Sequence, residues 1–213
     1  MKELLSFDLD QTLIETKKVH FEAWKIAFKQ NKLIPPKKDK IIALLDGRNA
    51  FEVAKGLAPK LSINKLQLLR QDHHDAVRIT AKYAKQISHA ARILKKLKKR
   101  FKLALVSNCS HIEIDALLRA TKFSKKLFDI IIGHGDVKRT KPFPDEIFKA
   151  ERLLHENAKY HVGDSIYDIL AAKKARVKSI SVLTGISSRN KLIKYHPDFI
   201  IKNISYLPKL LSL

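Results

Sequence analysis

Two aspartates, Asp8 and Asp10, lie one residue apart in the stretch FDLDQTL, directly after an apolar run. At about 4 Å and an effective dielectric constant near 20, two such charges repel each other by roughly 4 kcal/mol. A cation offsets this repulsion, and Mg²⁺ is suitable because it takes few carboxylates and keeps waters that a phosphate can replace. The pair therefore indicates phosphoryl transfer. One carboxylate attacks phosphorus, and the other protonates the leaving oxygen and later activates water.

Three further polar clusters follow apolar runs later in the chain. They comprise Ser107 and Asn108 in VSN, Lys141 in KRTKPFPDE, and Asp164 and Asp168 in VGDSIYDI. Ligands of open parallel sheets bind beyond the carboxyl ends of the strands, so we expect these side chains to meet the aspartate pair. There, Asp164 anchors the cation, while Ser107, neighbouring backbone N–H groups and Lys141 hold the oxygens of the transferring phosphoryl group.

Strands that end near one another must position these side chains. Six apolar runs are typical of buried strands, at residues 3–9, 101–107, 128–134, 159–164, 178–184 and 198–202. From residue 101 onward they alternate with amphipathic stretches, which predicts a parallel α/β sheet. Residues 16 to about 90 show helical patterns only. We therefore expect an α/β core of residues 1–15 and 91–213, with a helical cap of residues 16–90 inserted after the first strand.

The motifs FDLDQTL, VSN, KP and GDSIYD, in this order, resemble those of the haloacid dehalogenase-like hydrolase superfamily. The insert is similar to its cap subclass one, as in phosphoglycolate phosphatases and β-phosphoglucomutases. The resemblance implies a Rossmann-like, three-layer α/β/α core and a Mg²⁺-dependent phosphatase that forms an aspartyl-phosphate. It implies that Asp8 is the nucleophile and Asp10 the general acid/base. The implied ligands are Thr12, Ser107, Asn108 and Lys141 for phosphate, and Asp8, Asp10, Asp164 and Asp168 for the metal.

Dehalogenases of this superfamily typically lack the second aspartate, because halide needs no leaving-group acid. Asp10 therefore favours phosphoryl transfer over dehalogenation. Asp168 has two interpretations that can both hold: it is a metal-anchoring acid, and it is the third residue after Ser165 in a capping box that begins there. Ser110 and Glu113 form a second predicted capping box.

The predicted cap contains weaker candidates for substrate binding. His20, in HFEAWK, resembles a histidine near the active site of phosphosugar mutases and sugar phosphatases; the alternative is a helix-face histidine near the hinge. Gly47 and Arg48, in LDGRN, resemble the substrate-specificity loop of such caps. Arg48 either binds a second anionic group of the substrate or is a solvated turn residue.

Several other residues are expected to take no part in the chemistry. Trp24 belongs to the cap core, Cys109 packs below the site, and the spacing of His73 and His74 fits no metal site. Gln11 and Arg176 stand where many relatives have glycine, and neither change removes a reacting group.

Composition narrows the class of protein. The chain of 213 residues is 45% hydrophobic and 30% charged, which is typical of soluble globular proteins, and no run approaches the ~20 apolar residues of a membrane span. Its single cysteine excludes an intrachain disulfide. Since MKELLSFDLD also lacks the features of a signal peptide, we expect a cytoplasmic protein, either monomeric or homodimeric.

The net charge of +22 has two interpretations. Lysine accounts for 33 of the 43 basic residues, and the lysines are spread along the whole chain. We interpret them as a solvated surface that attracts anionic substrates, with non-specific nucleic-acid binding as the alternative. The functional hypotheses are therefore a phosphatase of a small phosphorylated metabolite, a phosphosugar mutase, and a basic nucleic-acid-binding scaffold.

Overall fold

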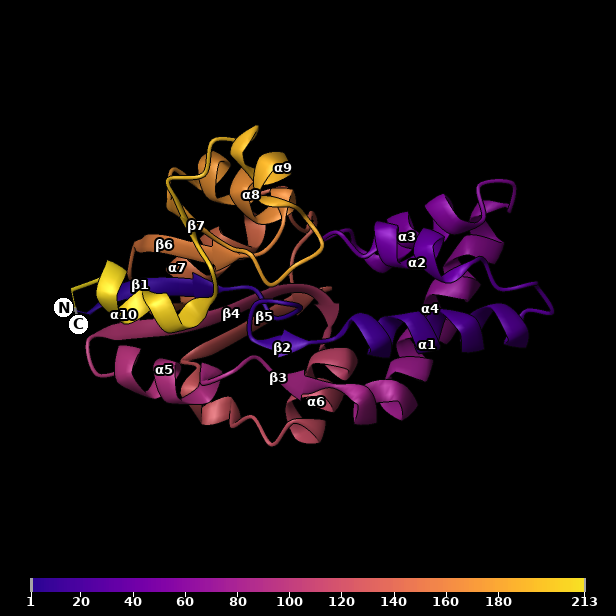
Figure 1. Ribbon diagram of the computed structural model, residues 1–213, viewed down its shortest axis with the longest axis horizontal. Coiled ribbons are helices and arrows are strands. Elements are labelled where there is room, and N and C mark those ends of the chain that lie inside the picture. Colours follow the sequence, from indigo (N-terminus) through magenta and orange to yellow (C-terminus); the bar gives the residue numbers. More distant parts are fainter. Residues whose placement is uncertain (1, 213) are drawn as a thin grey trace.

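The computed structural model describes residues 2–212 and contains a six-stranded sheet (Figure 1). The strands lie in the order β5-β4-β1-β6-β7-β8, and all neighbouring pairs are parallel. Their bounds are β1 Glu3–Phe7, β4 Phe101–Ser110, β5 Ile130–His134, β6 Ala158–Gly163, β7 Lys178–Val182 and β8 Phe199–Ile201. Each of the six predicted runs forms one strand, so the predicted parallel α/β core is confirmed.

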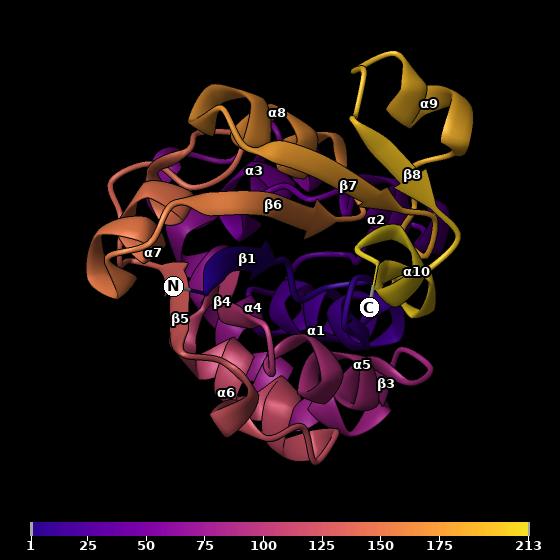
Figure 2. The ribbon, with the colours of Figure 1, turned by 90° about the vertical axis from the view of Figure 1, so that its left-hand side faces the viewer.

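Helices cover both faces of this sheet and complete the three layers, with α8 on one side and α5 and α6 on the other (Figure 2). One layer contains α5 Ala90–Leu97, α6 His111–Ala120 and α10 Leu207–Leu210, and the other contains α7 Asp145–Leu154 and α8 Ile166–Ala175. The remaining elements of this half are α9 Arg189–Ile193 and the short 3₁₀ helices η2 Lys125–Leu127 and η3 Ile204–Tyr206.

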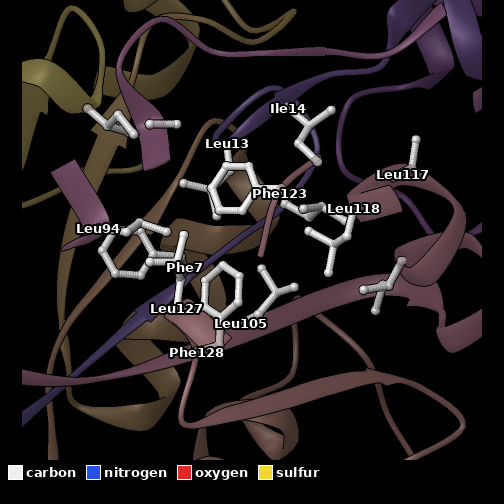
Figure 3. Packing of buried hydrophobic residues seen from close by; sticks show 14 of the residues in the cluster. Phe7, Leu13, Ile14, Leu94, Leu105, Leu117, Leu118, Phe123, Leu127 and Phe128 are labelled. Carbon is white, nitrogen blue, oxygen red and sulfur yellow. The ribbon is translucent and has the colours of Figure 1, made fainter. Parts of the chain in front are cut away.

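The strands are continuous apolar runs because both of their faces are buried. Successive side chains point to opposite faces of a strand. Leu5 and Phe7 of β1 therefore pack with Leu105 against α5 and α6, while Leu4 packs towards α7. Figure 3 shows Phe7 and Leu105 in the first of these clusters, among Leu117, Leu118, Phe123 and Phe128.

Four further helices form a separate group beside the carboxyl edge of the sheet (Figure 1). They are α1 Lys17–Gln30, α2 Lys38–Leu44, α3 Ala50–Leu57 and α4 Ile63–Thr80. They have their own apolar cluster, in which Trp24 is fully buried. This agrees with the expected place of Trp24. The division into core and cap at residues 16 and 90 stays a prediction.

The expectation of helices alone between residues 16 and 90 was wrong. After α4 and the 3₁₀ helix η1 (Ala81–Tyr83), strand β3 (Lys85–Gln86) pairs antiparallel with β2 (Ile14–Glu15). Both residues of β3 are exposed, so no apolar pattern marks them as a strand. The two-stranded ribbon joins the segments that enter and leave the four-helix group.

The loop after β1 contains the first departure from the family pattern. Gln11 has a left-handed backbone (φ 57°), a conformation that favours glycine. With its amide oxygen turned towards α1, the Gln11 side chain accepts hydrogen bonds from the N–H groups of Thr16 (2.7 Å) and Lys17 (3.0 Å). Because Thr16 makes no side-chain cap for α1, this amide takes over that role.

The helices within residues 2–212 are too short or too polar to cross a membrane.

Candidate active site

The four predicted polar clusters meet at the carboxyl edge of the sheet. Asp8 follows β1, and its backbone N–H donates to the Val162 carbonyl of β6 at 2.9 Å, which fixes the start of the loop. The resulting pocket has about 690 Å³ of empty volume, part of it open to solvent. The core side chains that line it are Asp8, Asp10, Gln11, Ser107, Asn108, Cys109, Glu113, Lys141, Asp164, Ser165 and Asp168.

Lys141 connects two of the carboxylates. Its Nζ lies 2.5 Å from Asp8 Oδ1 and 2.7 Å from Asp168 Oδ1, and the side chain is buried. Burial alone would lower the pKa of this amine, but the charges of Asp168 and Asp8 raise it instead. Lys141 is therefore a permanent cation at the base of the pocket.

The acidic groups are crowded in low-dielectric surroundings. Burial, with repulsion from Asp168 and Asp10, raises the pKa of Asp8 to about 8 despite the opposing charge of Lys141. Burial and the charge of Asp8 likewise raise the pKa of Asp164 well above its ordinary value. Lys141 alone thus does not supply enough positive charge to keep every carboxylate in the pocket ionised.

The residues present fit a divalent cation with oxygen ligands. Asp8, Asp164 and Asp168 are all buried, and each offers a carboxylate oxygen within 4.8 Å of those of the other two. An all-oxygen set is the chemistry that Mg²⁺ prefers. The Asp10 carboxylate belongs to a different group, with His20 and Cys109, so a metal contact by its side chain stays a prediction.

Asp168 serves as a helix cap in addition to its contact with Lys141. Its Oδ2 accepts from the Ser165 backbone N–H (3.0 Å) and hydroxyl (2.5 Å), which completes the predicted capping box of α8. His161 lies 3.1 Å from the other oxygen. Although burial opposes it, these cationic and hydrogen-bonding partners hold the pKa of Asp168 below its usual range. The capping interpretation is confirmed and leaves one oxygen facing Lys141.

Asp10 is held by three side chains. Thr16 Oγ1 donates to Oδ1 at 2.5 Å, His20 Nε2 lies 2.9 Å from the same oxygen, and Cys109 Sγ donates to Oδ2 at 3.0 Å. Burial tends to raise the pKa of Asp10, but His20 outweighs it and the pKa is lowered. The carboxylate thus has a defined orientation towards the pocket.

The expected position of Cys109 below the site was wrong. Strand β4 extends to Ser110 with a shift of register after Val106, and the Cys109 side chain lines the pocket beside Asp10. Burial, followed by the charge of Asp10, raises the pKa of the thiol well above its usual value. A thiol held neutral in this way is not a nucleophile, as predicted.

His20 lies in the pocket, and not only on a helix face near the hinge. Burial lowers the pKa of its imidazole, but the adjacent Asp10 charge raises it by more. Its other ring nitrogen lies 3.2 Å from His73 Nε2. The histidine is therefore positioned by groups on both sides.

The loop before α3 reaches from the four-helix group to the core. Gly47 accepts a hydrogen bond from Asn108 Nδ2 (2.8 Å), and Arg48 Nε donates to Tyr167 Oη at 3.2 Å. Arg48 also pairs with the buried Asp46 at 3.0 Å. Both Gly47 and Arg48 line the pocket, to which Lys141 and the carboxylates also contribute. Arg48 is consequently not a free turn residue.

Some of the predicted phosphate ligands line the pocket, and one lies buried behind its wall. Ser107 and Asn108 line the pocket, and Asn108 also donates to the Lys141 carbonyl at 3.1 Å. Thr12 is fully buried, with its hydroxyl 3.5 Å from Asp164 Oδ1. Its position indicates support of that carboxylate, so phosphate binding by Thr12 stays a prediction.

Sequence reasoning missed His73 and Glu113 as parts of the site. Both line the pocket, although Glu113 was expected only to cap α6 and His73 was considered only as a metal ligand, which its spacing did not support. Lys17, at the first position of α1, also lines the pocket and was not singled out. A histidine in the middle of a helix carries no local signal that it faces another histidine on a neighbouring helix, as His73 of α4 faces His20 of α1.

Comparison with known proteins agrees with this architecture. A family model described as haloacid dehalogenase-like hydrolase matches residues 5–182. The pyrophosphatase PpaX of Anoxybacillus flavithermus is 29% identical over 210 residues, which cover 97% of this chain and 95% of PpaX.

Two solved structures have the same fold. A protein from Bacteroides fragilis, assigned as a haloacid dehalogenase-like hydrolase, superposes with a TM-score of 0.88 at 23% identity, covering 97% of this chain and 100% of its own. A protein from Thermotoga maritima, assigned as a β-phosphoglucomutase, gives 0.74 at 21% identity, covering 99% and 98%. At these identities both structures bear on the fold alone.

Proposed function

This chain belongs to the haloacid dehalogenase-like hydrolase family and is a phosphatase of that family, and we propose that its Asp8 and Asp10 hydrolyse the phosphate of a small metabolite. The observation that carries the proposal is the placement of two differently held carboxylates in one pocket. Asp8 faces Lys141 and the acidic cluster, whereas Asp10 faces Thr16, His20 and Cys109. Two carboxylates in such different environments are suited to two different tasks.

Asp8 is the nucleophile in this proposal. Its carboxylate oxygen attacks phosphorus, the bond from phosphorus to the leaving oxygen breaks, and an aspartyl-phosphate forms. Lys141, Ser107 and Asn108 bind the oxygens of the transferring group as charge redistributes over them. The raised pKa of Asp8 requires positive charge nearby for the carboxylate to be ionised at neutral pH.

Asp8, Asp164 and Asp168 would hold Mg²⁺, which would supply that charge and neutralise charge on the oxygens of the phosphoryl group. The fit rests on the three buried carboxylates and on the deficit of positive charge around them.

Asp10 is the general acid and base. In its protonated form it donates a proton to the leaving oxygen in the first step. As the resulting carboxylate it removes a proton from the water that attacks phosphorus in the second step, the bond from phosphorus to the Asp8 oxygen breaks, and Asp10 is protonated again. Its contacts with Thr16 and His20 keep the carboxylate in one orientation through both steps. The Gly47 and Arg48 contacts to the core close the pocket on the opposite side, which limits access of bulk water.

The substrate is a small phosphorylated compound, and inorganic pyrophosphate is the first candidate to test. Similarity to a pyrophosphatase over nearly the whole chain supports it, as do the three cations that line the pocket, Lys17, Arg48 and Lys141. The experiment is a screen of phosphorylated metabolites, pyrophosphate and p-nitrophenyl phosphate with Mg²⁺, comparing wild type with Asp8→Asn. We expect release of phosphate by wild type only. Full turnover by Asp8→Asn would show that Asp8 is not the nucleophile.

A phosphosugar mutase is the second candidate function. The His20–Asp10 contact favours it, because HFEAWK resembles a stretch found in such mutases. A mutase converts a sugar monophosphate into its isomer and releases little free phosphate, so a coupled isomerisation assay separates it from a phosphatase.

The third hypothesis, a nucleic-acid-binding scaffold, predicts affinity that falls steeply with salt. Nucleic-acid binding that is absent or insensitive to salt contradicts this hypothesis.

We propose that the enzyme is cytoplasmic and is a monomer or a homodimer.

A further inference from the structure

A continuous series of contacts leads from the Asp10 carboxylate into the protein interior. His20 Nε2 lies 2.9 Å from Asp10 Oδ1, and His20 Nδ1 lies 3.2 Å from His73 Nε2. His73 Nδ1 in turn lies 3.6 Å from Glu113 Oε1, within ion-pair range. His20, His73 and Glu113 are 9%, 2% and 1% exposed. Asp10 is thus linked to two buried residues that have no other assigned task in the chemistry.

The donors and acceptors in this series have a defined direction. Ionised carboxylates only accept hydrogen bonds, so His20 Nε2 donates to Asp10, and a hydrogen on His73 Nδ1 is favoured opposite Glu113. That tautomer leaves His73 Nε2 as an acceptor for His20 Nδ1. Both nitrogens of His20 are then engaged, and its ring has no lone pair free for a metal ion. His20, His73 and Glu113 therefore form a series in which His20 contacts Asp10 and His73 at hydrogen-bond distance, and His73 Nδ1 lies 3.6 Å from Glu113 Oε1.

Packing fixes both inner members of the series. The fully buried Trp24 stacks on the His73 ring, with centroids 4.1 Å apart and planes at 20°. Glu113 Oε2 accepts from the Ser110 N–H (2.8 Å) and hydroxyl (2.9 Å), and His74 Nδ1 lies 2.8 Å from the same oxygen. With the plane of His73 and the position of Glu113 set, the orientation of His20 is set as well.

We propose that His73 and Glu113 are positioning residues, which orient His20 and thereby hold Asp10 for proton transfer. The inference rests on the proposed function, because it assigns a task within the same site. Neither residue needs to touch substrate to act in this way. Their effect is confined to the two proton transfers that depend on Asp10.

The chain offers a matched pair of variants for the test. His73 and His74 are adjacent on α4, both are buried, and both face Glu113, but only His73 contacts His20. His73→Leu removes the contact with His20, whereas His74→Leu removes a neighbouring contact with Glu113 and keeps the contact between His73 and His20. His73→Gln tests rescue, because its amide oxygen replaces the acceptor that Nε2 provides. Circular dichroism checks the fold of each variant.

The readout is kcat/KM with Mg²⁺ for two esters that differ in their need for a general acid. Nitrophenolate leaves with little protonation, whereas the more basic phenolate of phenyl phosphate depends on Asp10. We expect His73→Leu to lower kcat/KM for phenyl phosphate about tenfold more than for p-nitrophenyl phosphate, which is less than the ~10²–10⁴-fold effect of a general acid itself. His73→Gln should recover most of this loss, and His74→Leu, which alters only the surroundings of Glu113, should change the ratio of the two values by less than His73→Leu does.

Equal effects on the two esters, or the same change in ratio for His73→Leu and His74→Leu, would overturn the inference while the proposed function stands. If His73→Leu does not fold, Glu113→Gln takes its place: it keeps the shape of the side chain but removes the charge opposite His73 Nδ1. A smaller change of ratio in the same direction supports the inference, and an unchanged ratio overturns it. Failure of the wild type to hydrolyse either ester would instead overturn the proposed function and the inference with it.

Discussion

The ammonium group of Lys141 lies 2.5 Å from the Asp8 carboxylate, and both side chains are buried at the carboxyl edge of the sheet. The same ammonium contacts Asp168 at 2.7 Å. One cation therefore neutralises part of the charge of the proposed nucleophile and of a predicted metal ligand. The same ion pairs therefore contribute to the stability of the folded protein and to the charge of the carboxylates proposed to react and to bind the metal.

Replacing Lys141 with Met should show how much these ion pairs contribute to the stability of the folded protein. The variant leaves two carboxylates buried without their partner, so we expect the free energy of unfolding to fall by about 3–5 kcal/mol. Mg²⁺ should restore more stability to the variant than it adds to wild type, because a bound cation replaces the missing charge. Urea denaturation with and without Mg²⁺ measures both effects. Lys138→Met, at an exposed neighbouring lysine, should change stability by no more than about 0.5 kcal/mol. Equal stability of Lys141→Met and wild type would contradict the buried ion pair.

Gly47 brings the loop before α3 into close contact with the core. A Cβ there would lie 2.5 Å from Ser165 Oγ and 2.7 Å from Ser165 Cβ, in a backbone with φ 102°. Gly47→Ala should therefore move the loop away from the core, break the Asn108 contact and lower kcat/KM by at least about tenfold, since small displacements in a catalytic site are costly.

Gly135→Ala is the control for Gly47→Ala. Gly135 has a similar φ of 99°, but a Cβ there meets no atom within 4 Å. The Gly135→Ala variant has the same backbone strain but no clash with a neighbouring side chain. We therefore expect its kcat/KM to match that of wild type. The same loss of activity in both variants would assign the effect to strain and contradict the proposed contact.

Glu146 gives a prediction about stability and pH. The side chain is fully buried, and neither carboxylate oxygen has a hydrogen-bond partner among residues 2–212. Burial raises its pKa from 4.5 to about 7. The folded protein therefore binds this proton more tightly than the unfolded chain, and stability must fall as pH rises between these values.

The Glu146→Gln variant isolates this effect, because glutamine does not titrate. The stability of wild type relative to the variant should be greatest below pH 4.5 and should fall by about 3 kcal/mol as pH rises through about 7. Urea denaturation of both proteins at a series of pH values measures the difference. A difference independent of pH would mean that Glu146 has an ordinary pKa.

The sheet and its acidic edge were predictable because both depend on local patterns. Leu4 and Leu5 point to opposite faces of β1 and both are apolar, so both faces of this strand had to be covered. In a parallel sheet the strands end at the same edge, so the polar residues that follow them had to meet there. The capping boxes at Ser110 and Ser165 were predictable for the same reason, since each involves residues three apart.

What the patterns did not predict depends on contacts between distant segments. His73 meets His20 across 53 residues, and Cys109 meets Asp10 across 99, after a shift of register in β4. Gln11 and Arg176 were recognised as replacements of glycine. Both indeed have positive φ, at 57° and 60°, but only the structure shows that the Gln11 amide supports the first turn of α1.

The central claim is that Asp8 is phosphorylated during turnover. The most direct test is to quench wild type in acid during steady-state hydrolysis with Mg²⁺ and to examine the peptides by mass spectrometry. We predict a phosphoryl group on Asp8 in wild type and none on Asp8→Asn, which should also have lost turnover. Release of phosphate without any adduct on Asp8, together with undiminished turnover by Asp8→Asn, would contradict the account.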